Sequence, residues 1–427
     1  MAVFIAYLLF LVILFVSVRL LFTKEGILSS PYDSEVKMKC TGMELLVIFI
    51  FATGLLAIQP LIAIRLAMLE VLCIVGIILS RNRVVFSIPI IIFLFFLLWT
   101  IIGLTYTSTT SYGIRMILKY AAPLLVCMFA SSVVRDGEIF LKALHNARIT
   151  GFIGLFVLFV PFITFLFQQS FWHEAAIVTH FITLAMFSLA MFFFSNEKNQ
   201  NLLWFIAFAL PCVFKVFRTD IMGTMLALCA FFTIKYRIKA IPIIIVLACL
   251  SVASIFYIPS VKAKMYFRPD EVTLTDFLTG NVDENNINTS GRKSVWEEAT
   301  RIYESNNELI GSGTGTIQKY LYDNYNFGAQ LHGDFLVMLV DNGLIGLILF
   351  LVMYFAVIIH CILIYQRSED NLIRLCAIAS GSSLIGVMVT MYSDNTISFS
   401  LATLSLPWGM YGMVLGMLEK QKSSIYG

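Results

Sequence analysis

The sequence has few charged residues. Asp, Glu, Lys and Arg make up 13% of its 427 residues, whereas 59% are hydrophobic. Because a soluble domain carries roughly a quarter charged residues, this composition excludes an ordinary soluble protein. Long apolar runs recur from one end of the chain to the other, and a run of about 18 or more residues is typical of a transmembrane helix. Backbone groups in lipid must bond within their own segment, so we expect helices rather than isolated strands.

The sequence also lacks a disulfide framework and a metal-site pattern. Seven of the eight cysteines lie inside apolar runs, and Cys40 lies in an early loop. None lies in the one long polar segment, residues 259–331, and no Cys or His spacing is typical of a metal site. We therefore expect no metal site.

No internal repeat is visible in the sequence. Inverted repeats mark many secondary transporters, so their absence counts against a membrane transporter or a glycolipid flippase. Such a carrier remains the alternative from another functional class, followed by a non-catalytic membrane scaffold. A carrier would favour paired, opposite charges near the bilayer midplane, whereas several charges here lie near the outer ends of the runs.

We predict an all-α, polytopic bundle of about thirteen transmembrane helices, within a range of about twelve to fourteen. The predicted spans are 2–22, 43–60, 62–80, 84–104, 112–134, 149–168, 174–194, 201–217, 219–235, 240–258, 342–365, 372–392 and 397–417. The close pairs around Arg65 and Arg218 are the places where a broken or re-entrant helix would change the count. The predicted organisation is transmembrane helices over 1–258, an outer loop with active-site elements over 259–341, and the last transmembrane helices over 342–427.

The loops divide by charge into two sets. The basic set is expected to be cytoplasmic by the positive-inside rule; it contains Lys24, Lys37, Lys39, Arg81, Arg83, Arg135, Lys142, Arg148, Lys235, Arg237, Lys239, Arg367, Arg374, Lys420 and Lys422. The opposite loops, TYTSTTSY, QQSFWHE and SDNT, have no Lys or Arg. The segment 259–331 falls on their side, so we predict an outer N-terminus and an inner C-terminus.

Five basic residues lie at the outer ends of spans, against this rule: Arg65, Arg115, Lys119, Lys215 and Arg218. Charges within spans are costly and often functional. On a continuous helix Lys215 and Arg218 would share a face, and arginine suits phosphate because its planar fork donates two parallel hydrogen bonds. We interpret the group as an anion site at the outer boundary. The alternative is that these side chains reach the interface individually, with Asp220 neutralising Arg218 and Glu70 neutralising Arg65.

The outer loop carries seven basic and ten acidic residues, which does not favour nucleic-acid binding. Its sequence RKSVWEEATRIYESN predicts a helix over about 292–305, preceded by a serine and a glycine suited to capping and holding an apolar stripe at helical spacing. Arg292 would lie in the first turn, where a cation opposes the helix dipole unless both bind one anion. The alternative is a surface arginine. GSGTG at 311–315 lacks the Gly-Lys-Ser/Thr ending of a nucleotide-binding loop, so we interpret it as a tight turn.

His332 is the candidate base. It precedes the apolar stretch DFLVMLVDN, which we expect to lie along the interface before Gly343 opens the next span. A neutral imidazole at the mouth of the bundle can accept a proton as a general base. A structural histidine is the alternative, and His173, beside Glu174, and His180 are rivals on the same side.

This arrangement resembles the O-antigen ligase and polymerase superfamily, which are bacterial membrane glycosyltransferases of the GT-C type. The resemblance rests on three features: Arg218 between two middle spans, Arg292 before Trp296 and a Gly-x-Gly turn, and His332 before a Gly-x-x-Gly that begins at Gly343. Two positions depart from the ligases. Gly333 follows the histidine where ligases commonly have Asn, Ser or Gln, and Phe217 precedes Arg218 where family members often have Ser.

The resemblance implies a metal-independent glycosyltransferase that needs no cofactor and uses an undecaprenyl-diphosphate-linked oligosaccharide at the periplasmic face of the bacterial inner membrane. It implies that Arg218 and Arg292 bind the diphosphate, with Lys215 and Arg115 in support, and that His332 is catalytic. The departure at Gly333 favours a polymerase of O-antigen or a related polysaccharide, with the O-antigen ligase as the alternative. The implied partners are the lipid-linked donor and acceptor, membrane lipid and a chain-length regulator protein, and not nucleic acid.

Overall fold

The computed structural model describes residues 2–30, 37–56, 61–160, 173–325 and 331–426. Its first half contains α1 (Ala2–Leu21), β1 (Gly26–Ser29), β2 (Lys37–Cys40), α2 (Gly42–Thr53), α3 (Ile62–Leu79), α4 (Ile88–Ile102), η2 (Gly103–Thr105), α5 (Thr110–Val133), α6 (Gly137–Phe159), α8 (Glu174–Phe194) and α9 (Lys198–Ala209). The middle contains α10 (Pro211–Phe214), α11 (Arg218–Tyr236), η3 (Arg237–Ala240), α12 (Ile241–Tyr257), α13 (Pro259–Met265), η4 (Pro269–Glu271), α14 (Leu274–Thr279) and η5 (Glu284–Asn286). The last part contains α15 (Arg292–Glu304), α16 (Thr316–Tyr325), α17 (Asp334–Arg367), α18 (Asn371–Met391), η6 (Ile397–Phe399), α19 (Ser400–Thr403) and α20 (Ser405–Tyr426).

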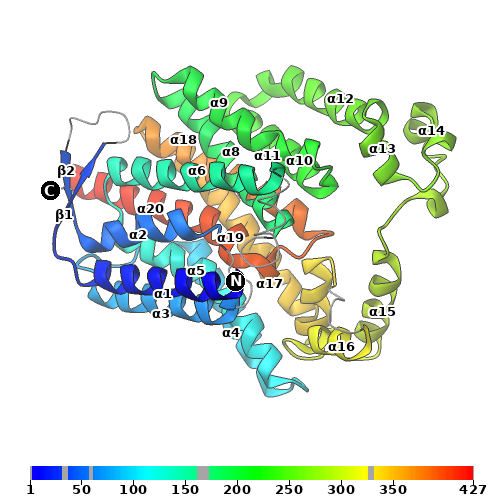
Figure 1. Cartoon of the computed structure of the whole chain (residues 1–427), viewed down its shortest axis with the longest axis horizontal. Coiled ribbons are helices and arrows are strands. Elements are labelled where there is room, and N and C mark those ends of the chain that lie inside the picture. Colours follow the sequence, from blue (N-terminus) through cyan, green and yellow to red (C-terminus); the bar gives the residue numbers. More distant parts are fainter. Residues whose placement is uncertain (1, 31–36, 57–60, 161–172, 326–330, 427) are drawn as a thin grey trace.

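The molecule is an all-α bundle, as the sequence predicts (Figure 1). Within the described ranges the exception is one antiparallel hairpin, in which Gly26 pairs with Cys40 and Ser29 with Lys37. Eight helices are long and apolar enough to cross a membrane, or nine if the bent pair formed by residues 397–403 and 405–423 is one span. The protein is therefore a multi-pass membrane protein.

This count is lower than the predicted twelve to fourteen spans. Helices α2 and α9 have only 12 residues each, which is short for crossing a hydrocarbon layer about 30 Å thick. The predicted spans 43–60 and 149–168 also extend into residues 57–60 and 161–168, which lie outside the described ranges. Helix α6 begins well before the predicted span, at Gly137, and it includes Lys142 and Arg148.

The apolar stretch 218–257 counts as one candidate span, but it folds back on itself. Arg237 has φ 53° and ψ −130°, which is not a helical conformation. Thr219, near the start of α11, and Ser254, near the end of α12, consequently line the same cavity. The two helices therefore form a hairpin, as the separate predictions for 219–235 and 240–258 require.

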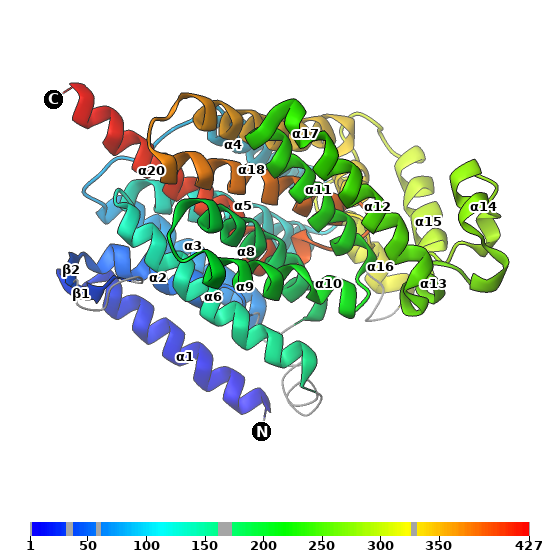
Figure 2. The same cartoon turned by 90° about the horizontal axis from the view of Figure 1, so that it is seen from above.

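The two ends of the bundle differ in composition. Both views place helices α13–α16 of the outer loop at one end, and the β-hairpin and the C-terminus at the other (Figures 1 and 2). This grouping agrees with the predicted division of the loops, since the hairpin contains Lys37 and Lys39 and the C-terminal helix contains Lys420 and Lys422.

The core of the bundle depends on close helix packing between α5 and α20. A Cβ added at Gly412 would lie 2.2 Å from the carbonyl oxygen of Cys127, and one added at Gly416 would lie 2.0 Å from that of Val134. Small residues permit this backbone approach, which is how helices associate in lipid without a hydrophobic driving force. Trp408 of α20 is fully buried and packs against Phe93 and Tyr354.

Helix α17 is broken at Gly343, where φ is 66° and ψ is −171°. This confirms the prediction that the stretch after His332 is distinct from the next span. The glycine turn packs directly into the break, because a Cβ at Gly343 would lie 2.5 Å from the backbone nitrogen of Gly311. The carboxylate of Asp341 accepts hydrogen bonds from the backbone N–H groups of Gly315 and Ile317, at 2.8 and 2.9 Å. The turn GSGTG therefore fixes the break in α17.

We expect Gly343→Ala to destabilise the protein by roughly 3 kcal/mol, because the side chain would both clash and require a left-handed backbone. The neighbouring Leu344, which is 40% exposed, provides a matched control. Thermal unfolding in detergent should show a lower Tm for Gly343→Ala than for Leu344→Ala. Equal Tm values for both variants would contradict the structural role of the break.

Candidate functional site

A large cavity lies at the loop end of the bundle. It has a volume of 720 Å³ and is bounded by α11, α12, α17 and α18, with residues 287–296 of the outer loop across its mouth. Its walls are mostly apolar: Ile221, Met222, Ile255, Val261, Met265, Ile287, Phe335, Phe355, Ile358, Ile385, Met388 and Val389. Ser251 and Ser254 also line it, but their hydroxyls donate to carbonyls of their own helix. The cavity is therefore an apolar chamber between predicted membrane helices.

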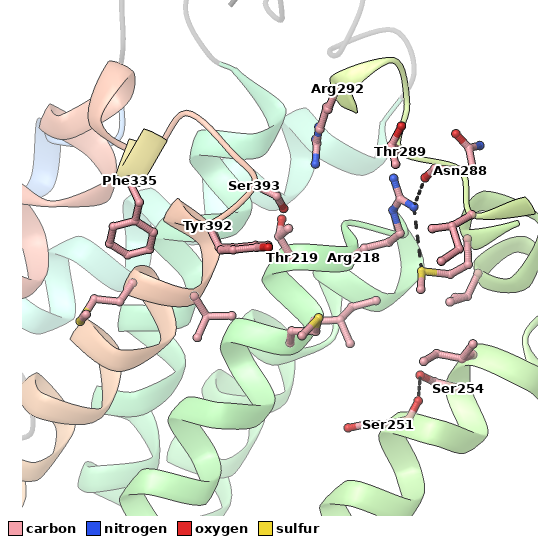
Figure 3. Close-up of a pocket in the computed structure, with 18 of the residues that line it drawn as sticks. Arg218, Thr219, Ser251, Ser254, Asn288, Thr289, Arg292, Phe335, Tyr392 and Ser393 are labelled. Atoms are coloured by element: carbon pink, nitrogen blue, oxygen red, sulfur yellow. Dashed lines mark hydrogen bonds between the residues drawn. The ribbon is translucent and has the colours of Figure 1, made fainter. Parts of the chain in front are cut away.

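The polar groups of the cavity gather at its mouth (Figure 3). Arg218 and Arg292 reach this edge from opposite sides, Arg218 from the first residue of α11 and Arg292 from the first residue of α15. Figure 3 also shows Thr219 and Ser393 near the two guanidinium groups. The sequence predicted both arginines as anion ligands, and the structure brings them to one cavity although 74 residues separate them.

The guanidinium group of Arg218 already forms hydrogen bonds within the protein. It donates to the backbone carbonyl of Asn288 at 2.6 Å and to the hydroxyl of Ser290 at 3.0 Å. The hydroxyl of Ser290 therefore binds Arg218 and does not form the cap that the sequence predicted for the helix over residues 292–305. The residue before α15 is Gly291, which has φ 76°. Asp220 is fully buried and accepts a hydrogen bond from Thr179 rather than pairing with Arg218.

The side chain of Arg292 has no hydrogen bond or ion pair to any described residue. The helix that it opens has its predicted apolar stripe, since Ala299 is buried and Val295 and Ile302 pack against the core. Arg218 and Arg292 are close enough for their positive charges to repel each other. Two cations at the mouth of a low-dielectric chamber favour a bound anion between them.

Lys264 of α13 is a third cation near this mouth, and sequence reasoning missed it. Its Nζ donates to the carbonyl oxygen of Val216 at 3.0 Å. Burial lowers the pKa of the Lys264 ammonium, and the charge of Arg218 lowers it further, against an opposing effect of Glu174. Charge alone would not have identified it, because the outer loop contains seven basic residues.

Lys215 and Arg115 do not line the cavity. Lys215 forms an ion pair with Glu174 at 3.7 Å. The helix is not continuous between Lys215 and Arg218, because α10 ends at Phe214 and Val216 has φ 55°. The predicted shared helical face therefore does not exist. Arg115 is exposed on α5 and lies over the ring of Tyr112, 5.3 Å from its centroid.

Of the other predicted outer-end cations, Arg65 is buried and donates to the carbonyl of Thr53. No ion pair joins Arg65 to Glu70 in the described structure, so the proposed neutralisation is not observed. The ammonium of Lys119 lies near the carboxylate of Asp334 and the guanidinium of Arg115.

His332 lies beside the cavity and forms a pair with Asp394. The Nδ1 atom of His332 is 3.3 Å from Oδ1 of Asp394. Its backbone carbonyl accepts a hydrogen bond from the indole N–H of Trp296, which lines the cavity. Burial alone would raise the pKa of Asp394, but the hydrogen bonds from His332 and from the Asn395 N–H, with nearby positive charge, hold it below its ordinary value.

The rival histidines lie in different surroundings. His173 stacks on Phe399 with ring centroids 4.3 Å apart. Burial lowers the pKa of the His173 imidazole, while the nearby carboxylate of Asp394 raises it. His180 is 1% exposed, and its Nδ1 contacts the carbonyl of Ala402 at 2.5 Å. His180 is thus enclosed in the core, whereas the side chain of His332 is 40% exposed.

Sequence reasoning missed Asp394. The loop SDNT drew attention only because it lacks basic residues, and an acidic residue in such a loop is common. The sequence feature that could have identified Asp394 is its place in an outer loop on the same side of the membrane as the candidate histidine. Among the described residues no three His, Cys, Asp or Glu side chains are grouped as a metal site.

Residues 203–351 match the family model described as O-antigen ligase. The match begins within α9 and ends within α17, so it includes Arg218, Arg292, His332 and the glycine turn. No curated protein matches the chain. The match covers 149 of the 427 residues, so this segment, which lies within the helical membrane bundle, is similar to the O-antigen ligase family.

Proposed function

We propose that the protein is a polymerase of O-antigen or of a related surface polysaccharide. It joins undecaprenyl-diphosphate-linked repeat units at the periplasmic face of the bacterial inner membrane and releases undecaprenyl diphosphate. The observation that carries this proposal is the amphipathic cavity: an apolar chamber of 720 Å³ between membrane helices, with Arg218 and Arg292 at its mouth. A polyprenyl diphosphate has the matching shape, an apolar chain ending in an anion.

In the proposed reaction a hydroxyl of the acceptor sugar attacks the anomeric carbon of the donor. The new glycosidic C–O bond forms while the bond from that carbon to the diphosphate oxygen breaks, and the electron pair leaves with undecaprenyl diphosphate. His332 accepts the proton of the attacking hydroxyl. Negative charge accumulates on the leaving diphosphate, so arginines fixed at that point stabilise the transition state more than the ground state.

The two arginines differ in how many hydrogen bonds they already make within the protein, and therefore in how readily each can bind a diphosphate. Arg292 has no partner among the described residues, so a diphosphate costs it no existing hydrogen bond. Arg218 already donates to Asn288 and Ser290, so it both anchors the loop and offers charge. Lys264 adds positive charge at the same mouth. We leave Lys215 and Arg115 out of the proposed site, because neither lines the cavity and Lys215 is paired with Glu174.

Gly333 favours a polymerase over a ligase. Its φ of 139° and ψ of 90° are rarely adopted by residues with side chains, and a Cβ there would lie 3.2 Å from the carbonyl oxygen of Tyr392. The Asn, Ser or Gln that ligases resembling this chain commonly have at this position would be strained here. The backbone next to His332 therefore requires glycine at position 333, and this requirement distinguishes the chain from the ligases.

A ligase that transfers the glycan to lipid A-core is the second candidate, because the matching family model is described as O-antigen ligase. Both activities use the same donor chemistry and differ in the acceptor. The family match favours either of them over a transporter or flippase. A chain-length regulator protein and surrounding membrane lipid are the further partners that this proposal includes.

A lipopolysaccharide gel of a deletion strain of the native host, with and without the complementing gene, separates the candidates. A core-plus-one-unit band without a ladder supports the polymerase, because ligation of single units continues. Loss of every O-antigen band, with lipid-linked polymer accumulating, supports the ligase. An unchanged ladder in the deletion strain contradicts both.

A further inference from the structure

We propose that Asp394 is a positioning residue that fixes the ring of His332 and leaves its Nε2 atom free to accept the proton of the acceptor hydroxyl. This inference rests on the proposed function, in which His332 is the base. Asp394 touches neither the donor nor the reacting atoms in this scheme and acts through His332.

The carboxylate of Asp394 is itself held in place. Its Oδ1 atom accepts a hydrogen bond from the backbone N–H of Asn395 at 2.8 Å, and the same atom lies 3.3 Å from Nδ1 of His332. The side chain of Asp394 is 15% exposed, against 40% for His332. A fixed, mostly buried acceptor therefore faces one nitrogen of a more exposed ring.

His332 is held at a second point through its backbone. The indole N–H of Trp296 donates to the carbonyl of His332, and the Trp296 ring packs edge-on against Tyr392 with centroids 6.2 Å apart. Tyr392 begins the loop that continues to Asp394. The histidine, the tryptophan of α15 and this loop consequently form one unit.

This unit separates two cavities. Ser393 lines the large apolar cavity, whereas Asn395 lines a small cleft of 30 Å³ together with Leu331 and Asp334. The residues on both sides of Asp394 thus face different spaces, and the pair of Asp394 and His332 lies in the wall between them. A base in that wall has the donor cavity on one side, and on the other a cleft with about the volume of one water molecule.

The hydrogen bond decides which tautomer a neutral His332 adopts. A carboxylate can only accept, so Nδ1 must carry the hydrogen and Nε2 keeps its lone pair. No described residue bonds to Nε2. After the proton arrives at Nε2, the Asp394 anion stabilises the resulting imidazolium, as carboxylates do beside catalytic histidines in other enzymes.

Two substitutions separate these effects. In Asp394→Asn the Asn395 N–H still requires a carbonyl oxygen at the same point, so the tautomer is retained and only the charge is lost. In Asp394→Ala both are lost. With purified protein and a lipid-linked donor, we expect kcat to fall about 10²-fold to 10³-fold for Asp394→Ala and by less for Asp394→Asn. The KM for the donor should change less than about twofold, because the cavity is untouched.

The structural readout does not depend on activity. Nitrogen-15 spectra of the ring atoms, at about pH 8.5 where imidazole is neutral, distinguish the two tautomers, and a His332→Gln variant assigns the signals among the five histidines. The Nδ1–H form should dominate in the wild type and in Asp394→Asn, and should give way to a mixture in Asp394→Ala. Unchanged His332 signals in Asp394→Ala would overturn the inference.

The outcomes also distinguish this inference from the proposed function. A changed tautomer with unchanged kcat in Asp394→Ala overturns the catalytic part of the inference. Full activity of a His332→Ala variant removes the base from the proposed function, while the ring signals still report whether Asp394 holds the histidine.

Discussion

Replacing His332 with alanine is expected to lower kcat for glycan transfer by about 10²-fold to 10⁴-fold, the usual contribution of a general base. The acceptor hydroxyl must lose its proton as the glycosidic bond forms, and the ring held by Asp394 is the group placed to take it. Binding of the donor should change little, because His332 does not line the cavity. The measurement is single-turnover transfer with saturating lipid-linked donor.

His173→Ala is the matched control for this prediction. His173 lies near both Asp394 and His332, but its ring stacks on Phe399, so its loss should leave most of the activity. If His173→Ala were the inactive variant and His332→Ala remained active, the base would have to be reassigned. Thermal unfolding of both variants shows whether either loss of activity reflects loss of the folded protein.

Replacing Arg292 with alanine is expected to lower kcat about 10²-fold to 10³-fold, comparable with the removal of one group that stabilises a developing anion. The guanidinium is free of other partners in the described structure, so its removal should not disturb the fold. Arg292→Lys should recover only part of the rate, because an ammonium keeps the charge but loses the planar fork that fits phosphate oxygens. Release of undecaprenyl diphosphate measures the effect directly.

Lys293→Ala is the control on the same helix. Lys293 is the next residue of α15, is exposed, and does not line the cavity. Its loss removes the same net charge from the loop but should change the rate less than about twofold. Equal losses for Arg292→Ala and Lys293→Ala would mean that general loop charge, rather than a fitted anion site, is responsible. Arg218→Ala is less informative, because that residue also anchors the loop at Asn288 and Ser290.

The sequence was sufficient for the class of fold because hydrophobic length is a direct physical requirement of the bilayer. It was less reliable for the number of spans. Helix α2 ends at Thr53, although the apolar residues continue beyond it, and hydropathy does not show where a helix stops. The break at Gly343 was predictable, because a glycine followed the apolar stretch after His332. The β-hairpin of residues 26–40 was not predicted, since its pairing depends on contacts that short loop sequences do not specify.

The parts of the candidate site that could be predicted are those at the ends of membrane helices or at the ends of the outer loop, because these positions can be inferred from the order of the spans. Arg218 and Arg292 reach one cavity mouth, as two ligands of one anion would have to, and His332 lies beside it. Lys215 was misplaced by the assumption of a continuous helix, which the left-handed Val216 interrupts. Asp394 lies 62 residues beyond His332, and only the packing of the loop after α18 against the start of α17 brings the two together.

The donor site can be tested in nanodiscs, with the purified protein supplied only with an undecaprenyl-diphosphate-linked repeat unit. A polymerase should form products of two or more repeats, with one undecaprenyl diphosphate released for each new linkage and with both signals strongly reduced in Arg292→Ala. Release of no undecaprenyl diphosphate, both with this substrate alone and after lipid A-core is added, would contradict the assignment of the cavity as a donor site for lipid-linked glycan.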